Sequence, residues 1–347
     1  MKVGIVGFPG VGKTTVFNAL TGLHASVGGY HEPGKANLGA IKVPDARVDR
    51  LSEIFRPQKT TYAEIVFVDV PGGSAATALE QSTLVQMRDV DALVQVIRGF
   101  PDALTGAPAD PLRELGDFRS ELILADLAVV EKRLARIRKE HGKGQEMDLL
   151  ARCLAALEAE TALRRVDLSA AEERMLAGFG LLSRLPLLVV LNVAEAQAAA
   201  PLPAALQAQA EGDGVPALAL CAQIEMEMAA LDADDRAAFL ADLGLTEPAR
   251  DRFIQAAYAL LDLISFVTTG EDEVRAWPIR RGTPALRAAG KIHSDIERGF
   301  IRAEVVAYDD FIRLGSEARC REAGKLRLEG KEYVVADGDI IHFRFNV

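Results

Sequence analysis

The 347-residue sequence predicts an α/β fold built on a doubly wound, largely parallel sheet. Short runs rich in Val, Ile and Leu recur along the chain, at residues 3–6, 65–70, 92–97, 187–191 and 217–220. These runs are continuously apolar instead of alternating, which is typical of strands in a parallel sheet covered by helices on both faces. Helical patterns follow several of the runs, as the crossover connections of such a sheet require.

Length, composition and charge limit the classes of function. The chain is 49% hydrophobic and 26% charged, and it exceeds the usual size of one compact core, so we expect two or three domains. A net charge of −10 disfavours a general polyanion binder, and we expect no DNA partner. The three cysteines are widely spaced and indicate neither a disulfide framework nor a zinc site. The longest apolar run, residues 185–191, is too short to span a bilayer, so we expect a cytoplasmic protein without a membrane partner.

A helical insertion is predicted at residues 111–183, where no run resembles a strand. Apolar residues recur at alternating four- and three-residue steps in two stretches, which indicates a coiled-coil seam. The seam residues are Ile123, Leu127, Val130, Leu134 and Ile137, then Leu150, Leu154, Leu157 and Thr161. A polar, glycine-containing turn at residues 142–145 would join the two arms into a hairpin. Packing within an ordinary helical bundle is the alternative, because each arm holds few heptads.

The last part of the sequence, residues 262–347, predicts a small mixed β domain. Strand-like segments lie at residues 273–279, 302–308, 333–335 and 340–345, and glycine-bearing turns separate them. The predicted division is therefore a nucleotide-binding domain at 1–110 and 184–261, a helical insertion at 111–183 and a C-terminal domain at 262–347.

Residues 7–14, GFPGVGKT, match the phosphate-loop pattern GxxxxGK[ST] between a predicted strand and a predicted helix. In such a loop the glycines let backbone N–H groups approach phosphates, the lysine reaches the β- and γ-phosphates, and the hydroxyl ligates Mg²⁺. Lys13 is the predicted catalytic residue and Thr14 a predicted metal ligand. The predicted phosphate-binding residues are Gly10, Val11, Gly12, Lys13, Thr14 and Thr15.

A carboxylate for the metal is predicted at Asp69, which closes the second apolar run in a DxxG pattern, DVPG. The pattern alone is weak, because Asp is common before a Pro-Gly turn. Its place after a buried strand favours the functional interpretation. Gly72 would let its N–H approach the γ-phosphate. The sequence thus predicts a site for Mg²⁺ and a nucleoside triphosphate.

The segment expected to contact the base is Asn192-Val193-Ala194-Glu195, after the fourth apolar run. Guanine-specific proteins of this class carry Asn-Lys-x-Asp there, and the Asp grips the guanine N1 and N2 donors. Glu195 is longer than Asp, and Val193 replaces the lysine, so guanine selectivity should be weak or lost. Asn192 can still reach a purine N7 or the adenine amino group. Cys221 and Ala222, one strand later, occupy the other loop expected to pass the base.

These motifs and their order resemble the Obg-like ATPase (YchF) family over essentially the whole length. The resemblance rests on GFPGVGKTT, VPDARVDRLSEI, ELILADL, NVAE and, most specifically, on AGKIHSD, GFIRAEV, LEGK and the terminal HFRFNV. It implies three modules: a nucleotide domain, a coiled-coil hairpin and a ubiquitin-like TGS domain with a β-grasp fold. It also implies a preference for ATP, slow hydrolysis and association with the ribosome or its RNA. A local excess of Arg and Lys in residues 275–302 fits contact with RNA phosphates, and an ordinary solvated face fits it equally.

The switch regions depart from the family's pattern. Residues 31–37, HEPGKAN, contain no Thr where the family offers one to Mg²⁺. The second switch is shortened, and Gly73 stands where related proteins place a water-orienting Gln. We therefore expect low intrinsic turnover and name no catalytic base. Two alternatives stay open: a guanine-specific GTPase, and a non-catalytic, nucleotide-gated binder of RNA or ribosomes.

Overall fold

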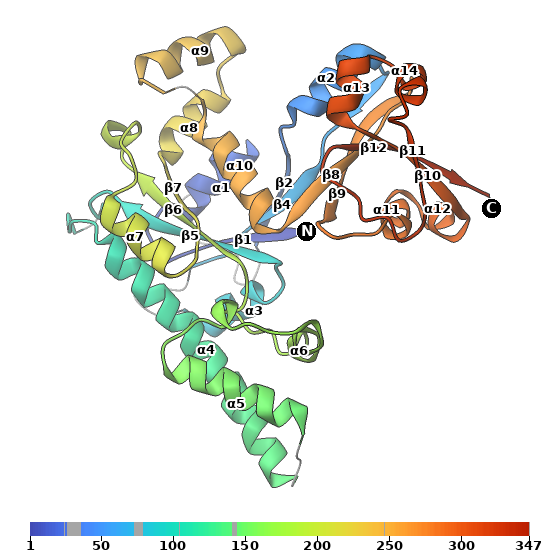
Figure 1. Cartoon of the computed structure of the whole chain (residues 1–347). Helices are drawn as coiled ribbons and strands as arrows, with labels where there is room; N and C mark the ends of the chain where they lie inside the picture. Colours follow the sequence, from blue (N-terminus) through green and yellow to red (C-terminus); the bar gives the residue numbers. More distant parts are fainter. Residues whose placement is uncertain are drawn as a thin grey trace. The chain divides into compact units, whose positions relative to one another are not determined.

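The computed structural model describes every residue except 24, 26–35, 73–78, 104, 141–143, 246 and 347, and the side chain at 233 (Figure 1). The chain divides into two compact units. The first contains Met1–Ile41 and Val66–Ala256, and the second contains Lys42–Ile65 and Ala257–Val347.

The first sheet confirms the predicted doubly wound α/β core. Its strand order is β2-β4-β1-β5-β6-β7, and β4, β1, β5, β6 and β7 pair parallel with their neighbours in that order. The strands are β1 (Lys2–Val6), β2 (Asn37–Lys42), β4 (Glu64–Asp69), β5 (Ala92–Gly99), β6 (Leu187–Val193) and β7 (Ala217–Leu220). Five of these match the predicted runs. The sixth, β2, was not predicted, because it is an edge strand that alternates between exposed and buried residues and so lacks a continuous apolar run.

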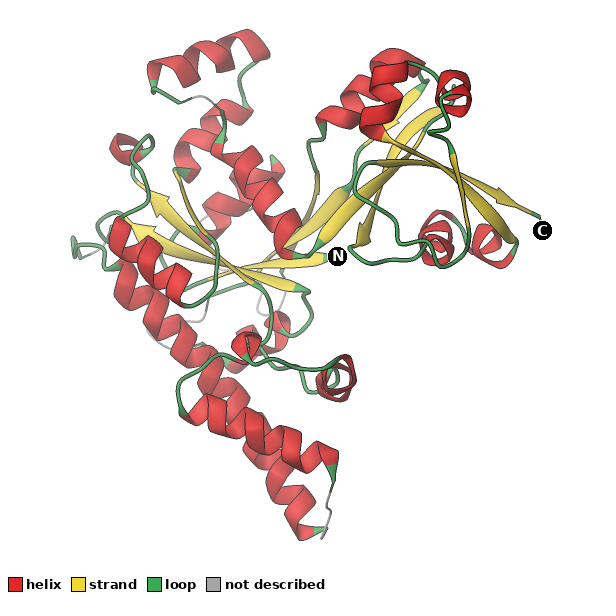
Figure 2. Cartoon of the chain, viewed as in Figure 1, coloured by secondary structure: helices red, strands yellow, loops and turns green. Residues whose placement is uncertain are grey.

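Helices cover both faces of this sheet, as Figures 1 and 2 show. On one face α4 packs against α7, and on the other α1 packs against α8. The helices of this part of the chain are α1 (Lys13–Thr21), α3 (Gln81–Met87), α4 (Pro111–Lys139), α5 (Gln145–Glu158), α6 (Ala170–Leu176), α7 (Ala204–Gly212), α8 (Ala222–Ala229), α9 (Ala233–Asp242) and α10 (Ala249–Leu260). Phe8 of the phosphate loop packs edge-on against Phe118 of α4, with ring centroids 6.1 Å apart.

The helical insertion consists of α4 and α5, which lie side by side, and α6 (Figure 1). The buried seam residues are Ile123, Val130, Leu134, Ile137, Leu150 and Leu157, as the heptad pattern predicts. The prediction of Thr161 as a seam residue is wrong. The helix α5 already ends at Glu158, and the Thr161 N–H donates to Ala156 O in the turn that follows. The same apolar cluster takes in Leu176 of α6, so bundle packing supplements the seam.

A buried carboxylate of α4 holds the end of the insertion, shortly before the chain enters the first sheet. Asp126 of α4 is fully buried and accepts hydrogen bonds from Leu182 N at 2.7 Å and Ser183 N at 2.8 Å, just before β6 begins. Burial raises the pKa of Asp126, and the bonds from Ser183 and Leu182 act in the opposite direction. The carboxylate therefore satisfies two backbone donors that would otherwise be buried without partners.

The second unit contains a sheet in the order β11-β10-β12-β8-β9-β3. β8 and β12 pair parallel at its centre, while β8–β9 and β10–β12 are antiparallel, which is the β-grasp arrangement that the resemblance implies. The strands are β3 (Lys59–Thr61), β8 (Leu263–Thr268), β9 (Glu273–Arg280), β10 (Phe300–Ala307), β11 (Arg327–Glu329) and β12 (Asp339–Phe345). The helices are α2 (Ala46–Phe55), α11 (Ala285–Ile292), α12 (Ser294–Arg298), α13 (Tyr308–Leu314) and α14 (Glu317–Glu322).

Two details of this unit differ from the sequence prediction. β8 and β11 were not predicted, and residues 333–335 form only an isolated bridge between Val334 and Pro284. Tyr333 instead packs against the core cluster, and its hydroxyl donates to Asp339 at 2.7 Å. The segment 333–335 has the residue types of a strand because its Tyr333 packs in the core and makes a polar contact, although the segment is not a strand.

The segment 42–65 belongs to the second unit, although the sequence analysis assigns it to the nucleotide-binding domain. β3 pairs parallel with β9, from Lys59 opposite Glu273 to Thr61 opposite Arg275. Phe55 of α2 stacks on Phe311 of α13, with ring centroids 5.5 Å apart. No sequence pattern predicts this assignment, because β3 is short and polar and its partner strand lies more than two hundred residues away in the chain.

Candidate nucleotide-binding site

The phosphate loop joins the end of β1 to the start of α1. Gly10 and Gly12 have φ values of +79° and +87°, in the left-handed region that favours glycine. At Gly12 space excludes a side chain as well, because a Cβ there would lie 2.3 Å from Asn192 Nδ2. Gly12 directly precedes α1, so the unpaired N–H groups of the helix's first turn, Thr15 among them, follow on from the loop. This is the backbone arrangement that binds phosphate.

Lys13 is held at the bottom of the loop. Its side chain is only 8% exposed, and Nζ donates to the carbonyl oxygen of Phe8 at 2.8 Å. Burial lowers the pKa of Lys13 to about 8, and the charge of Asp69 opposes that shift. A desolvated ammonium with one backbone partner is prepared to exchange that partner for a phosphate oxygen.

The two predicted metal ligands contact each other. Asp69 ends β4 and is 2% exposed, and the Thr14 hydroxyl donates to Asp69 Oδ2 at 3.0 Å. The described residues contain no group of three or more His, Cys, Asp or Glu side chains that could hold a metal ion. One carboxylate and one hydroxyl fit Mg²⁺, which takes oxygen ligands and is usually completed by substrate phosphates and water.

Gly72, the glycine of the DxxG pattern, lies against the end of Lys13. A Cβ built on Gly72 would sit 2.6 Å from Lys13 Nζ and 3.3 Å from Gly7 O. A side chain at position 72 would therefore displace the end of Lys13 from this place. Thr83 of α3 holds the same turn in place, since its hydroxyl donates to Pro71 O at 2.9 Å. The second switch therefore begins next to the phosphate loop.

Asn192 links the phosphate loop to the second base loop. Its Nδ2 donates to Val11 O at 3.1 Å, and its Oδ1 accepts from Ala222 N at 3.1 Å. The side chain is 4% exposed. A carboxamide offers two donors and two acceptor lone pairs, so one of each stays available for a base. The NVAE motif predicts only a contact of Asn192 with the base, and this bridge was not predicted.

The remaining base-loop residues are arranged less tightly. Glu195 is exposed and starts a short 3-10 helix, whereas Val193 is buried within β6. Cys221 is buried directly before α8, and burial raises the pKa of its thiol, with the charge of Glu195 acting in the same direction. Cys221 is thus a small buried residue at the base loop, whereas the Glu195 side chain is exposed.

Three contacts of the site were not predicted. Phe8 O accepts from Lys13, Asn37 Nδ2 donates to Asp69 Oδ2 at 3.2 Å, and Glu121 Oε2 accepts from Leu79 N at 3.2 Å. A sequence pattern does not predict which backbone carbonyl accepts a hydrogen bond from a side chain. Asn37 stands in the HEPGKAN segment and Glu121 in ELILADL, so the motifs contain both residues without revealing their partners. Residues 31–35 of the first switch and Gly73 lie outside the described residues.

The predicted basic segment at 275–302 is largely paired with acids. Arg281, Arg287 and Arg298 form ion pairs with Asp262, Glu297 and Asp295. Arg275 lies over the ring of Trp277, 4.0 Å from its centroid. Because these arginines are paired, the segment carries less unpaired positive charge than its number of Arg and Lys residues indicates. The structure therefore favours an ordinary solvated surface over a strongly basic, RNA-binding one.

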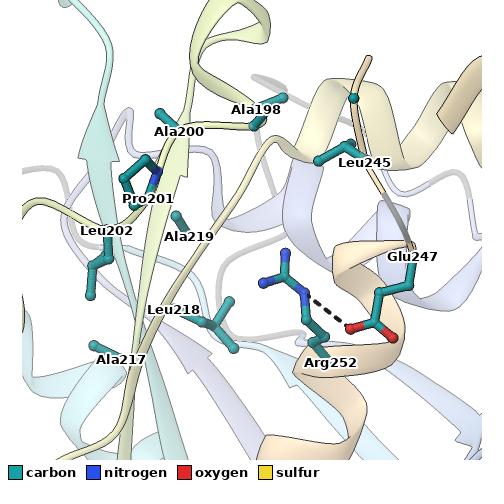
Figure 3. A pocket seen from close by; sticks show the side chains of 12 residues that line it. Ala198, Ala200, Pro201, Leu202, Ala217, Leu218, Ala219, Leu245, Glu247 and Arg252 are labelled. Atoms are coloured by element: carbon teal, nitrogen blue, oxygen red, sulfur yellow. Dashed lines mark ion pairs between the residues drawn. The ribbon is translucent and has the colours of Figure 1, made fainter. Parts of the chain in front are cut away.

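A separate cavity of about 400 Å³ lies beside β7, which is an edge strand of the first sheet (Figure 3). Its lining comes from the segment 198–202, from β7 itself and from the residues around Glu247 and Arg252, an ion pair at 3.8 Å. None of the predicted phosphate, metal or base residues lines this cavity. In the described part of the chain, no helix is long and apolar enough to cross a membrane.

The first sheet with its phosphate loop, buried lysine and paired Thr14 and Asp69 defines a P-loop nucleoside triphosphate-binding protein. A family model described as "50S ribosome-binding GTPase" matches residues 2–132, and the YchF-GTPase_C model, described as a protein of unknown function, matches residues 263–346.

The chain belongs to the YchF family. It is 40% identical to the "Ribosome-binding ATPase YchF" of Bacillus subtilis (strain 168) over 100% of both chains. It is 38% identical to the protein of the same name from Escherichia coli O157:H7, over 100% of this chain and 99% of that one. The solved structure of the Schizosaccharomyces pombe YchF GTPase superposes with a TM-score of 0.88 at 29% identity, covering 99% of this chain and 97% of that one.

Proposed function

We propose that this protein is an ATP-binding, slowly hydrolysing switch that associates with ribosomes. The observation that carries the proposal is the group formed by Lys13, Thr14, Asp69 and Gly72 at the ends of β1 and β4. These residues come from two neighbouring strands and meet where a triphosphate would lie over the loop.

Each residue has a distinct role in this proposal. Lys13 neutralises charge on the β- and γ-phosphates and on the transferred phosphoryl group, while the loop N–H groups orient the phosphates. Thr14 and Asp69 would hold Mg²⁺, which neutralises phosphate charge when it is bound. Gly72 borders the end of Lys13, and in this proposal its N–H would approach the γ-phosphate. These residues would suffice to bind the triphosphate and to stabilise charge on the transferred phosphoryl group. No described residue is assigned as the base that activates the attacking water, so turnover should be slow.

The base loop supports ATP over GTP. Guanine recognition requires a carboxylate at the position of Glu195 with the reach of Asp and a lysine at the position of Val193. Here Val193 is buried in β6 and contributes no charge. The spare donor and acceptor of Asn192 serve a purine N7 or the amino group of adenine without requiring guanine. Glu195, Cys221 and Ala222 complete the proposed base site.

The proposed partner is the ribosome, because the full-length relatives from Bacillus subtilis and Escherichia coli bear the name ribosome-binding ATPase. Ribosome association implies a cytoplasmic location. The helical hairpin and the β-grasp unit are the proposed regions of this contact, because neither carries Lys13, Thr14, Asp69 or Gly72. Local rather than global positive charge would contact RNA, given the net charge of −10.

Single-turnover hydrolysis tests the proposed activity. Purified protein in excess over ATP should release phosphate slowly, and ribosomes can be added to the same assay. Lys13→Ala should abolish this release, since the transferred phosphoryl group loses its buried cation. Thr105→Ala, a change in an exposed turn far along the chain, is the control and should hydrolyse ATP as the wild type does. Release that persists in Lys13→Ala would show that another site or a contaminant is responsible.

A guanine-specific GTPase is the second candidate, because the matching N-terminal model and the solved relative are both described as GTPases. It predicts that GTP displaces a bound adenine nucleotide at least about tenfold better than ATP does. The non-catalytic binder is the third candidate, and the shortened switches favour it. It predicts nucleotide binding that depends on Lys13 without any phosphate release, with or without ribosomes.

A further inference from the structure

The end of the first switch touches the metal site through one side chain. Asn37, the first residue of β2, donates from Nδ2 to Asp69 Oδ2 at 3.2 Å. Thr14 donates to the same oxygen at 3.0 Å. Asp69 is 2% exposed, so its orientation is fixed by these neighbours and not by solvent.

This pair of hydrogen bonds suits metal binding chemically. An ionised carboxylate has about four lone-pair positions and uses two of them for Thr14 and Asn37, so it can still bind a metal ion or a metal-bound water. The Thr14 hydroxyl spends its single proton on Asp69, which leaves the lone pairs of Oγ1 for the metal. Asn37 can only donate to Asp69 and cannot compete with it as a charged ligand. Its contact therefore orients the carboxylate.

The described flanks of the first switch are both held by asparagine side chains. At the beginning, Asn18 Nδ2 donates to Ala25 O at 2.8 Å and Asn18 Oδ1 accepts from Ala25 N at 2.9 Å. At the end, Asn37 contacts Asp69. The HEPGKAN segment lacks a threonine for the metal, and of its two described residues, Ala36 and Asn37, the hydrogen bond to the metal site comes from Asn37.

We propose that Asn37 is a positioning residue for the divalent metal of the nucleotide site and acts by orienting Asp69. The inference rests on the proposed function, since it presupposes a Mg-nucleotide at Thr14 and Asp69. Outer contacts of this kind set ligand orientation, and their loss typically lowers metal affinity about tenfold or more. The removal of the Asn37 amide should accordingly lower the affinity for the metal ion. It should leave the affinity for the nucleotide in the absence of metal unchanged.

The test is a Mg²⁺ titration of complex formation with a fluorescent, non-hydrolysable ATP analogue, paired with the analogue's affinity in EDTA. Asn37→Ala should raise the half-saturating Mg²⁺ concentration about tenfold and change the affinity in EDTA by less than about twofold. Leu38→Ala is the matched control, because Leu38 is the next residue of β2 and is 59% exposed. It should leave both quantities as in the wild type.

A double variant separates positioning from a general structural effect. In an Asp69→Asn background, Asn37→Ala should cause no further loss, because its effect passes through the carboxylate. An unchanged Mg²⁺ requirement in Asn37→Ala, an equal weakening with and without Mg²⁺, or a full additional loss in the Asp69→Asn background would overturn the inference. Failure of the proposed site is recognised differently: the wild type itself would then bind the analogue without any dependence on Mg²⁺.

Discussion

The buried Lys13 should make nucleotide affinity depend on pH in a range where ordinary lysines stay charged. Burial places its pKa at about 8 in the free protein, against a usual value of 10.5. The protonated fraction of the free protein then falls from about nine-tenths at pH 7 to about one-tenth at pH 9. Phosphate oxygens favour the ammonium form, so bound Lys13 keeps its proton throughout this range. If only the protonated form binds, ATP affinity should fall about tenfold between pH 7 and pH 9, or about 1.4 kcal/mol.

Titration of a fluorescent ATP analogue at half-unit steps of pH measures this dependence. Lys13→Ala reports the contribution of the nucleotide's own ionisation and should give a flat profile over the same range. Calorimetry in two buffers of different ionisation heat provides an independent reading, with an uptake of about 0.9 proton on binding at pH 9 and about 0.1 at pH 7. A wild-type profile that runs parallel to that of Lys13→Ala, with no proton uptake at pH 9, would refute the role assigned to the buried ammonium.

Three further substitutions test the geometry. Asn192→Ala removes two buried hydrogen bonds and should lower the free energy of unfolding, measured in urea, by about 2–4 kcal/mol. The control Glu195→Gln changes an exposed side chain and should have little effect. A loss below about 1 kcal/mol for Asn192→Ala would contradict the bridge between Val11 and Ala222. Gly72→Ala should spare folding, because a lysine end can move, yet weaken ATP binding about tenfold or more; unchanged affinity would show that Gly72 does not border the γ-phosphate. Asp126→Asn replaces one of the two accepting oxygens with an NH2 donor, so one backbone N–H group loses its acceptor. This should cost about 1–3 kcal/mol in urea, and a cost under about 0.5 kcal/mol would argue against these hydrogen bonds.

Features with a local physical signature could be predicted from the sequence. Four of the buried parallel strands and the edge strand β7 are short apolar runs, and the phosphate loop follows the first of them. The loop pattern requires glycine where φ is positive and lysine where a phosphate must be reached. The seam of α4 was predicted for the same reason, because heptad spacing brings its residues to one side of the helix.

Features that depend on distant partners could not be predicted. β3 is three polar residues whose only reason for being a strand is β9. β2 alternates, so the search for continuous apolar runs passes over it. The contacts of Asn37 and Asn192 join residues 32 and 181 positions from their partners, and a single sequence does not report such pairs. The motifs supplied the candidate residues, and the fold determined what each one touches.

The competition between ATP and GTP for the phosphate loop tests the central claim most directly. In the presence of Mg²⁺, unlabelled ATP and GTP would each displace a fluorescent adenine nucleotide from the wild type and from Asn192→Ala. The account predicts that ATP displaces the label at least as well as GTP, and that Asn192→Ala weakens both nucleotides, because Asn192 holds Val11 and Ala222 in place. A wild type that prefers GTP by about tenfold or more would contradict the account.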